Sequence, residues 1–145
     1  MSSKWVSRMH GFMPLNEQER KLKDLLEKLQ FSYRTHEVFP FAGRSLVVDS
    51  FLPELDLVVE CWMSESRQGT ALTWLERNAA FIDVKFTRLK LLDSRLRCLG
   101  LVQAPQADPV SLKQVVGSMM GHADFMVYSF DELERILQNL AGMKT

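Results

Sequence analysis

The feature that most constrains this chain is a change of hydrophobic period near residue 70. Before it, three runs rich in β-branched and aromatic residues follow one another across short turns, at 31–39, 44–51 and 55–62. After it, apolar residues recur at helical spacing over 70–92. Short turns join antiparallel strands, whereas a long helix permits a crossover to a parallel strand. The pattern predicts an antiparallel meander followed by a crossover helix.

The flanking segments extend this order. A helix is expected over 16–30, because leucines recur there at helical spacing and Asn16 with Glu19 resembles a capping box. The apolar run 95–104 is expected to be a buried strand parallel to its neighbour. The last three elements are expected to be a helix at 110–120, a strand at 123–129 and a helix at 130–141. The predicted fold is α/β, with an αβββαβ core, a mixed central sheet flanked by helices, and a C-terminal α-β-α extension.

Length and charge set further limits. The chain has 145 residues, which suits a single domain. Within it we expect an N-terminal arm over 1–14, a core over 16–104 and an extension over 105–145. The formal net charge is zero, with 18 basic and 18 acidic residues. Binding to DNA would therefore depend on a local basic face rather than on the charge of the whole protein.

Several classes of protein are disfavoured. Cys61 and Cys98 lie in apolar runs without C-x-x-C spacing, which favours free thiols over a zinc site. The chain lacks the roughly 20 consecutive apolar residues of a membrane span, and its start lacks the apolar region of a signal peptide. A glycine-rich phosphate loop is also absent. We expect a cytoplasmic protein in a reducing compartment, with no membrane partner and no nucleotide cofactor.

The segment around the second short turn carries a family resemblance. VVDSFLPELDLVVECW at 47–62 looks like the strand-turn-strand of the PD-(D/E)xK nuclease superfamily. EQERKLKDLLEKLQFSYRTHEV at 17–38 resembles the opening helix and first strand of that group, and LRCLGLVQA at 96–104 matches the strand that ends its core. The chain is similar in particular to very-short-patch repair endonucleases and archaeal Holliday-junction resolvases. The resemblance implies a restriction-endonuclease-like fold that cuts or holds DNA.

In that superfamily, acidic residues on the second and third core strands hold a divalent metal that activates a water for attack on a phosphodiester. Asp49 and Glu60 stand at the matching positions, and the turn between their strands brings the two together. The resemblance adds Glu19 of the first helix and the backbone carbonyl of Cys61 as further metal ligands. The implied cofactor is Mg²⁺ or Mn²⁺, which hard oxygen ligands suit.

The basic residues of the site depart from the family pattern. The superfamily's lysine normally lies two residues after the second acid, where this chain has Trp62. Some relatives supply the lysine from the following helix, and Lys85 is the candidate for that role here. Arg77, Arg88 and Lys90 of the same predicted helix are candidates for contacts with neighbouring phosphates.

Other interpretations of these residues stay open. The segment IDVKF contains a literal D-x-K, so Asp83 and Lys85 would form the motif if they lay on a strand. The unbroken helical stripe through this segment argues against that placement. Glu19 has the competing role of completing the capping box. The three histidines show no metal-ligand spacing, and neither His36 nor His122 receives a role.

The expected function is that of a metal-dependent endonuclease hydrolysing DNA phosphodiester bonds, in repair or recombination. The competing hypothesis is a catalytically inactive module of the same fold for DNA binding or subunit assembly, and a third is an interaction domain unrelated to nucleic acid. A basic rim beside an acidic pocket would favour the nuclease, whereas an apolar patch around Trp62, Phe81 or the N-terminal arm would favour assembly. Many nucleases of this fold are homodimers, so self-association would not separate the cases.

Overall fold

The computed structural model describes residues 16–64 and 70–144. The elements are, in chain order, α2 (Glu17–Lys28), β1 (Arg34–Phe41), β2 (Arg44–Leu52), the short 3₁₀ helix η1 (Pro53–Leu55), β3 (Leu57–Met63), α3 (Thr70–Leu92), β4 (Arg97–Gln103), α4 (Pro109–Met119), β5 (Phe125–Val127) and α5 (Phe130–Lys144). The strands form one sheet in the order β1-β2-β3-β4-β5. β2 is antiparallel to β1 and β3, whereas β4 is parallel to β3 and β5. The predicted α/β order and mixed sheet are confirmed.

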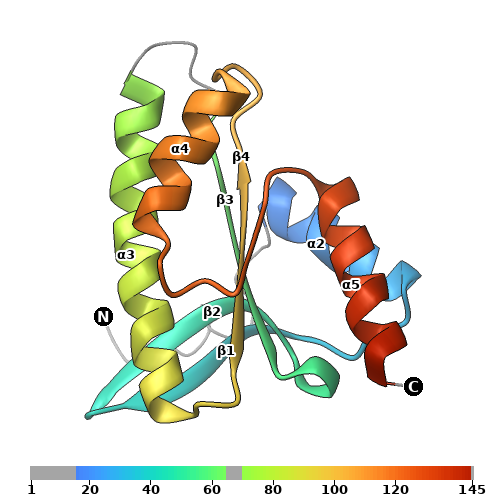
Figure 1. Ribbon diagram of the computed structural model, residues 1–145. Helices are drawn as coiled ribbons and strands as arrows, with labels where there is room; N and C mark the ends of the chain where they lie inside the picture. Colours follow the sequence, from blue (N-terminus) through green and yellow to red (C-terminus); the bar gives the residue numbers. More distant parts are fainter. Residues whose placement is uncertain (1–15, 65–69, 145) are drawn as a thin grey trace.

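Helices cover both faces of the sheet (Figure 1). α3 and α4 lie on one face, and α2 and α5 lie on the other. Buried apolar side chains fill both interfaces, among them Phe86 of α3 and Val102 of β4 on one face and Leu26 of α2 and Leu57 of β3 on the other. β3 and β4 are therefore buried on both sides, which explains why their sequences are continuous apolar runs rather than alternating ones.

The predicted capping box at the start of α2 is confirmed. The backbone N–H of Glu19 donates to Oδ1 of Asn16 at 2.8 Å, and the N–H of Asn16 donates to Oε1 of Glu19 at 3.0 Å. These two bonds satisfy backbone donors that the first turn of a helix leaves unpaired. They also fix the carboxylate of Glu19 at the end of α2 that lies nearest β3.

The turn between β1 and β2 is tighter than the sequence predicts. The turn residues predict a four-residue connection over 40–43, but β1 continues through Pro40 and Phe41. Only Ala42 and Gly43 form the turn, with φ angles of 50° and 76°, as in a type I′ hairpin. The prediction is wrong because β1 is an edge strand, where proline costs no ladder hydrogen bond.

β2 and β3 separate after a short paired stretch. Their backbone pairing covers Leu52↔Leu57, Phe51↔Val58 and Ser50↔Val59 and ends there. β3 instead pairs with β4 along its whole length. The next residues along the two diverging strands are Asp49 and Glu60, so both acids lie at the fork of the sheet.

α3 occupies the predicted range, and the alternative D-x-K motif on a strand is wrong. Asp83 and Lys85 lie on a helix, because the buried stripe that includes Leu75 and Phe86 continues through this segment. Two residues apart on a helix, their side chains diverge. The carboxylate of Asp83 binds His122, accepting from its backbone N–H and lying against Nδ1, both at 2.8 Å. None of the helices within the described ranges has the length and apolar character needed to cross a membrane.

Candidate functional site

Carboxylates take the place of backbone partners where β2 and β3 separate. The N–H of Cys61 donates to Oδ2 of Asp49 at 2.7 Å, and the N–H of Asp49 donates to Oε2 of Glu60 at 3.1 Å. Backbone donors that lose a ladder partner in a protein interior must find another acceptor. The structure thus brings Asp49 and Glu60 side by side and holds both carboxylates through the backbone of the opposite strand.

Lys85 reaches this fork from α3. Its Nζ donates to the backbone carbonyl of Val47 at 2.8 Å and forms an ion pair with Oε1 of Glu60. The Glu60 side chain is only 4% exposed. Each oxygen of Glu60 therefore has a donor, one from the β2 backbone and one from α3, as a buried carboxylate requires.

Trp62 occupies the position that the superfamily pattern gives to lysine. It lies two residues after Glu60 and points to the same face of β3, where it is buried against α3 with Val58 and Phe86. The indole therefore fills the core beneath α3, and the ammonium group comes from α3 itself. Because Trp62 is buried, it does not form the apolar surface patch that the assembly hypothesis predicts for it.

The electrostatics of the fork favour a cation or a proton. Burial, followed by the neighbouring carboxylate of Glu60, raises the pKa of Asp49 from 3.8 to about 8, and Glu19 adds a smaller effect in the same direction. The hydrogen bond from the N–H of Cys61 acts the opposite way. Burial also raises the pKa of the Cys61 thiol well above its usual value, and Asp49, Glu60 and Glu19 contribute. The carboxyl groups of Asp49, Glu60 and Glu19 thus all lie near enough to Cys61 to influence its thiol.

Glu19 enters the site with a partner that sequence reasoning missed. Nε2 of His36 lies 2.6 Å from Oε2 of Glu19, and both side chains are largely buried. His36 has a φ of 52° and lies across the hairpin from Asp49, between the register pairs Thr35↔Ser50 and Glu37↔Val48. A left-handed backbone at a non-glycine residue is unfavourable and is often found at functional sites.

A signal for His36 is present in the sequence. A two-residue turn at Ala42 and Gly43 sets the register of the hairpin, and that register places position 36 opposite position 49. The longer predicted turn leaves this register open, so it does not bring His36 to the acids. The information that was missing is the turn type, not the chemistry of the histidine.

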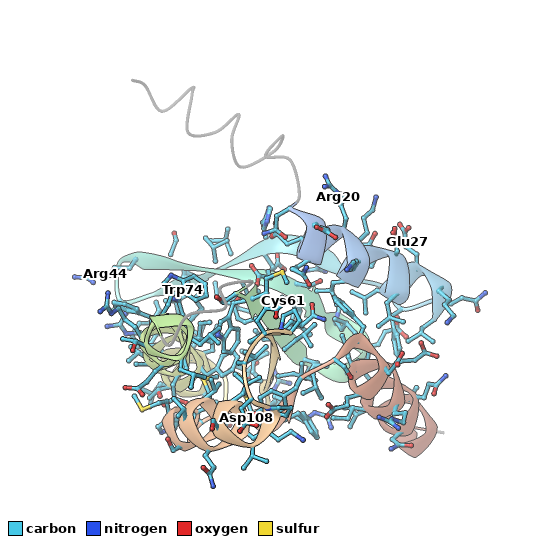
Figure 2. The ribbon with its side chains drawn as sticks, turned by 90° about the horizontal axis from the view of Figure 1, so that it is seen from above. Arg20, Glu27, Arg44, Cys61, Trp74 and Asp108 are labelled. Atoms are coloured by element: carbon cyan, nitrogen blue, oxygen red, sulfur yellow. The ribbon has the colours of Figure 1, made fainter. Side chains whose placement is uncertain are left out.

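The fork, meaning Asp49, Glu60 and the backbone around them where β2 and β3 diverge, is not a ready-made metal centre among the described residues. In the described ranges, no group of three or more His, Cys, Asp and Glu side chains lies close enough to hold an ion. The carboxylates near the fork have protein partners in this structure: Lys85 binds Glu60, and the two oxygens of Glu19 contact Asn16 and His36. Cys61 lies between α2 and the part of α3 that carries Trp74 (Figure 2).

The three basic candidates on α3 have different surroundings. Arg77 is exposed and Arg88 is half-buried, and neither forms an ion pair with any residue that the structure describes. Lys90 instead pairs with Asp124 at 2.5 Å and donates to the carbonyl of Leu96 at 3.3 Å. Arg77 and Arg88 are therefore available for a ligand, whereas Lys90 is already engaged.

The outer face of α3 is also rich in exposed apolar side chains. Phe81 is 70% exposed and Trp74 is 44% exposed, and the side chains of Val84 and Leu91 on the same helix are also exposed. Two arginines, Arg77 and Arg88, and several exposed apolar side chains therefore occur on the same helix. This surface alone does not separate the nuclease from the assembly hypothesis. Comparisons with protein-family models, with curated proteins and with solved structures each find no match to this chain.

Proposed function

We propose that this protein is a metal-dependent nuclease of the restriction-endonuclease-like fold that hydrolyses DNA phosphodiester bonds. The observation that supports it most directly is the arrangement of Asp49, Glu60 and Lys85 at the fork of β2 and β3. Asp49 and Glu60 lie where β2 and β3 diverge, and Lys85 reaches them from α3. Two carboxylates beside a lysine supply the metal ligands and the cationic group that phosphodiester hydrolysis uses. The order of elements and the mixed sheet agree with this fold.

The donor set of the fork fits a hard divalent cation. Asp49 and Glu60 offer carboxylate oxygens, and Glu19 lies near enough to influence Asp49. In a strand, the amide and carbonyl of one residue face the same neighbour, so the carbonyl of Cys61 faces Asp49 as its N–H does. Oxygen ligands of this kind suit Mg²⁺ or Mn²⁺, which would supply a bound water of lowered pKa for attack on phosphorus.

The chain's own residues would have separate tasks. Asp49 favours a bound proton in the structure, and a cation binding there would displace that proton. His36 holds Glu19 beside the fork and positions it as an additional ligand. Lys85 would turn from Glu60 toward the scissile phosphate, where its ammonium group stabilises the charge that develops on the phosphate oxygens. Arg77 and Arg88 would bind flanking phosphates.

A second function is favoured by a different observation. Both oxygens of Glu60 are already bonded, and the exposed Phe81 lies on the outside of α3. These features fit a catalytically inactive module of this fold that binds DNA or assembles subunits, for example as a homodimer. The two functions differ in whether a divalent metal binds at Asp49 and produces cleavage.

The decisive experiment is cleavage of labelled duplex, single-stranded and four-way-junction DNA with Mg²⁺ or Mn²⁺. We expect metal-dependent cutting by the wild type and a loss of about 1,000-fold in Asp49→Asn and Glu60→Gln, which keep side-chain size. Asp83→Asn is a matched control, because it removes a carboxylate that contacts His122 instead of the fork. Absence of cutting by folded wild type would reject the nuclease in favour of the inactive module.

A further inference from the structure

Exposed aromatic side chains and arginines that form no ion pair with a described residue alternate on the outside of α3. Five residues follow one another at steps of three or four and so lie along one stripe of the helix: Trp74, Arg77, Phe81, Val84 and Arg88. Trp74, Phe81 and Val84 are exposed, and the two arginines form no ion pair within the described part of the chain. The stripe has cationic and apolar groups but no acidic residue.

The charge on this stripe limits what can cover it. Two copies packed through this stripe would bring Arg77 and Arg88 of each copy against arginines and apolar side chains, since the stripe positions hold no acidic residue, which is unfavourable for self-association. A partner that combines negative charge with flat apolar surfaces is complementary. Nucleic acid with unpaired bases has both, because its phosphates suit arginine and its bases stack on aromatic rings.

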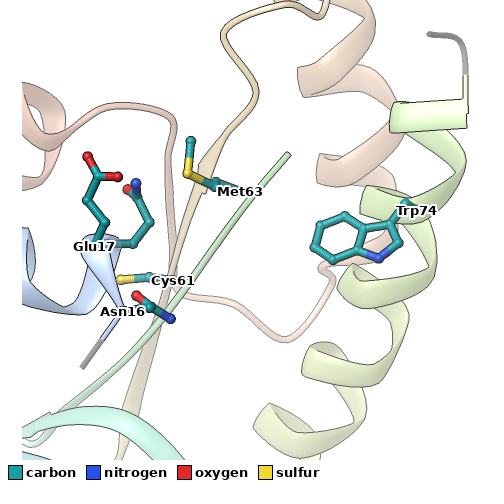
Figure 3. A pocket seen from close by; sticks show the side chains of 6 residues that line it. Asn16, Glu17, Cys61, Met63 and Trp74 are labelled. Atoms are coloured by element: carbon teal, nitrogen blue, oxygen red, sulfur yellow. The ribbon is translucent and has the colours of Figure 1, made fainter. Parts of the chain in front are cut away.

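Trp74 also forms one wall of a pocket of about 480 Å³ (Figure 3). Asn16, the N-cap of α2, lines the opposite side together with Glu17 and Gln18 of that helix, and Cys61 and Met63 of β3 lie between. Gln18 is 8% exposed, and its Oε1 has no hydrogen-bond partner among the described residues. The Oε1 atom is buried, so a ligand in the pocket would reach the Gln18 amide once that amide turned toward it. An amide with unused hydrogen-bonding capacity opposite an aromatic ring is suited to the edge and face of a nucleobase.

The pocket adjoins the fork. Cys61 lines it and donates its N–H to Asp49, and Met63 lies three residues beyond Glu60, which is roughly 10 Å along a strand. On α3, Trp74 and Lys85 are eleven residues apart and so point to nearly the same side of the helix. By these two measures, about 10 Å along β3 and about 16 Å along α3, a base in the pocket would lie within a few nucleotides of a phosphate at Asp49 and Glu60.

We infer that Trp74 and Phe81 bind unpaired bases of the nucleic acid, and that one such base enters the pocket between Trp74 and Gln18. The inference rests on the proposed function and narrows its substrate to DNA with a single-stranded or splayed segment next to the scissile phosphate. Arg77 and Arg88 bind the phosphates that connect the stacked bases. Fully paired duplex cannot offer a base to this face without being opened.

The test measures binding without cutting. Fluorescence anisotropy in EDTA compares a labelled 20-nucleotide single strand with a fully paired 20-base-pair duplex, for wild type, Trp74→Leu, Phe81→Leu and Leu91→Ala. We expect each leucine substitution to weaken single-strand binding by about 10-fold and to leave duplex binding unchanged. Leu91→Ala removes an exposed side chain of the same helix that cannot stack, and it should bind both ligands as the wild type does.

The other outcomes are distinguishable. Equal single-strand binding by wild type, Trp74→Leu and Phe81→Leu would overturn the inference, even if Asp49-dependent cleavage were found. Weaker binding by both leucine variants with no cleavage by the wild type would support the base-binding face and reject the nuclease. A change from dimer to monomer in Phe81→Asp, measured by light scattering, with unchanged single-strand binding, would identify the face as a self-association surface instead.

Discussion

Two lysines of α3, five residues apart, each form an ion pair with a carboxylate, and the two carboxylates differ in how far they are buried. Lys85 binds Glu60 and a backbone carbonyl of β2, and Lys90 binds Asp124 and the carbonyl of Leu96. In both pairs, the carboxylate also accepts from a backbone N–H of the sheet, at 3.1 Å for Glu60 and 2.7 Å for Asp124. By local chemistry alone the two pairs are nearly equivalent.

Their surroundings are not equivalent. The Glu60 side chain is 4% exposed and has a second carboxylate, Asp49, directly beside it, whereas the Asp124 side chain is 35% exposed. Asp124 ties the loop before β5 to β4, through its carboxylate and through its N–H, which donates to the carbonyl of Cys98 at 2.8 Å. Of the two ion pairs, the one at Glu60 is therefore the candidate active site, because there burial and a second carboxyl group make negative charge energetically costly.

The largest difference is expected in catalysis. Lys85→Met should reduce metal-dependent DNA cleavage by about 1,000-fold, because the ammonium group near the reacting phosphate is lost. Lys90→Met should cut within about twofold of wild type, because Lys90 binds Asp124 and the carbonyl of Leu96, away from Asp49 and Glu60. Single-turnover cleavage of labelled DNA measures both. Equal losses in the two variants would show that the lysines act through the stability of α3 and not through chemistry.

Stability should separate the pairs next. Lys85→Met leaves Glu60 buried without its cation and should lower the free energy of unfolding by about 3 kcal/mol. Lys90→Met should lower it by less than about 1 kcal/mol, since Asp124 remains partly hydrated. Urea unfolding followed by circular dichroism gives both values. A larger effect at Lys90 would contradict the role that burial has in this comparison.

The pH dependence of stability should distinguish the fork from the exposed pair. The pKa of Asp49 is raised to about 8 in the folded protein, above its unfolded value of 3.8. The folded state therefore binds more protons between these values, and this contribution to stability is present below about pH 4 and is lost as the pH rises through 8. Asp49→Asn should flatten that decrease, and Asp124→Asn should not. Thermal unfolding from pH 4 to pH 9 tests it; identical slopes in all three proteins would exclude it.

A smaller effect is expected from metal binding without catalysis. Ca²⁺ at ten times its dissociation constant should stabilise the wild type by about 1.4 kcal/mol, because the ion binds only the folded fork. Lys90→Met should respond equally, and Asp49→Asn should not respond. Unfolding with and without Ca²⁺, at constant ionic strength, provides the measurement. Stabilisation that persists in Asp49→Asn would place the ion elsewhere.

Most of the elements could be predicted from the sequence because each has a local signal. The helical period over 70–92 is sufficient to place α3, and Asn16 with Glu19 is sufficient to begin α2. The boundaries of β1 are predicted less well, since Pro40 suggests the start of a turn although it lies within the strand. That error conceals the tight turn at Ala42 and with it the position of His36 opposite Asp49.

The order of the elements and the closeness of Asp49 and Glu60 follow from local sequence patterns, because periodicity and short turns act between neighbours in the chain. The environment of each ion pair depends instead on tertiary packing. Whether a lysine of α3 meets a buried Glu60 or an exposed Asp124 depends on how the helix docks on the sheet. That docking is set by the packing of side chains far apart in the sequence, and no local pattern records it.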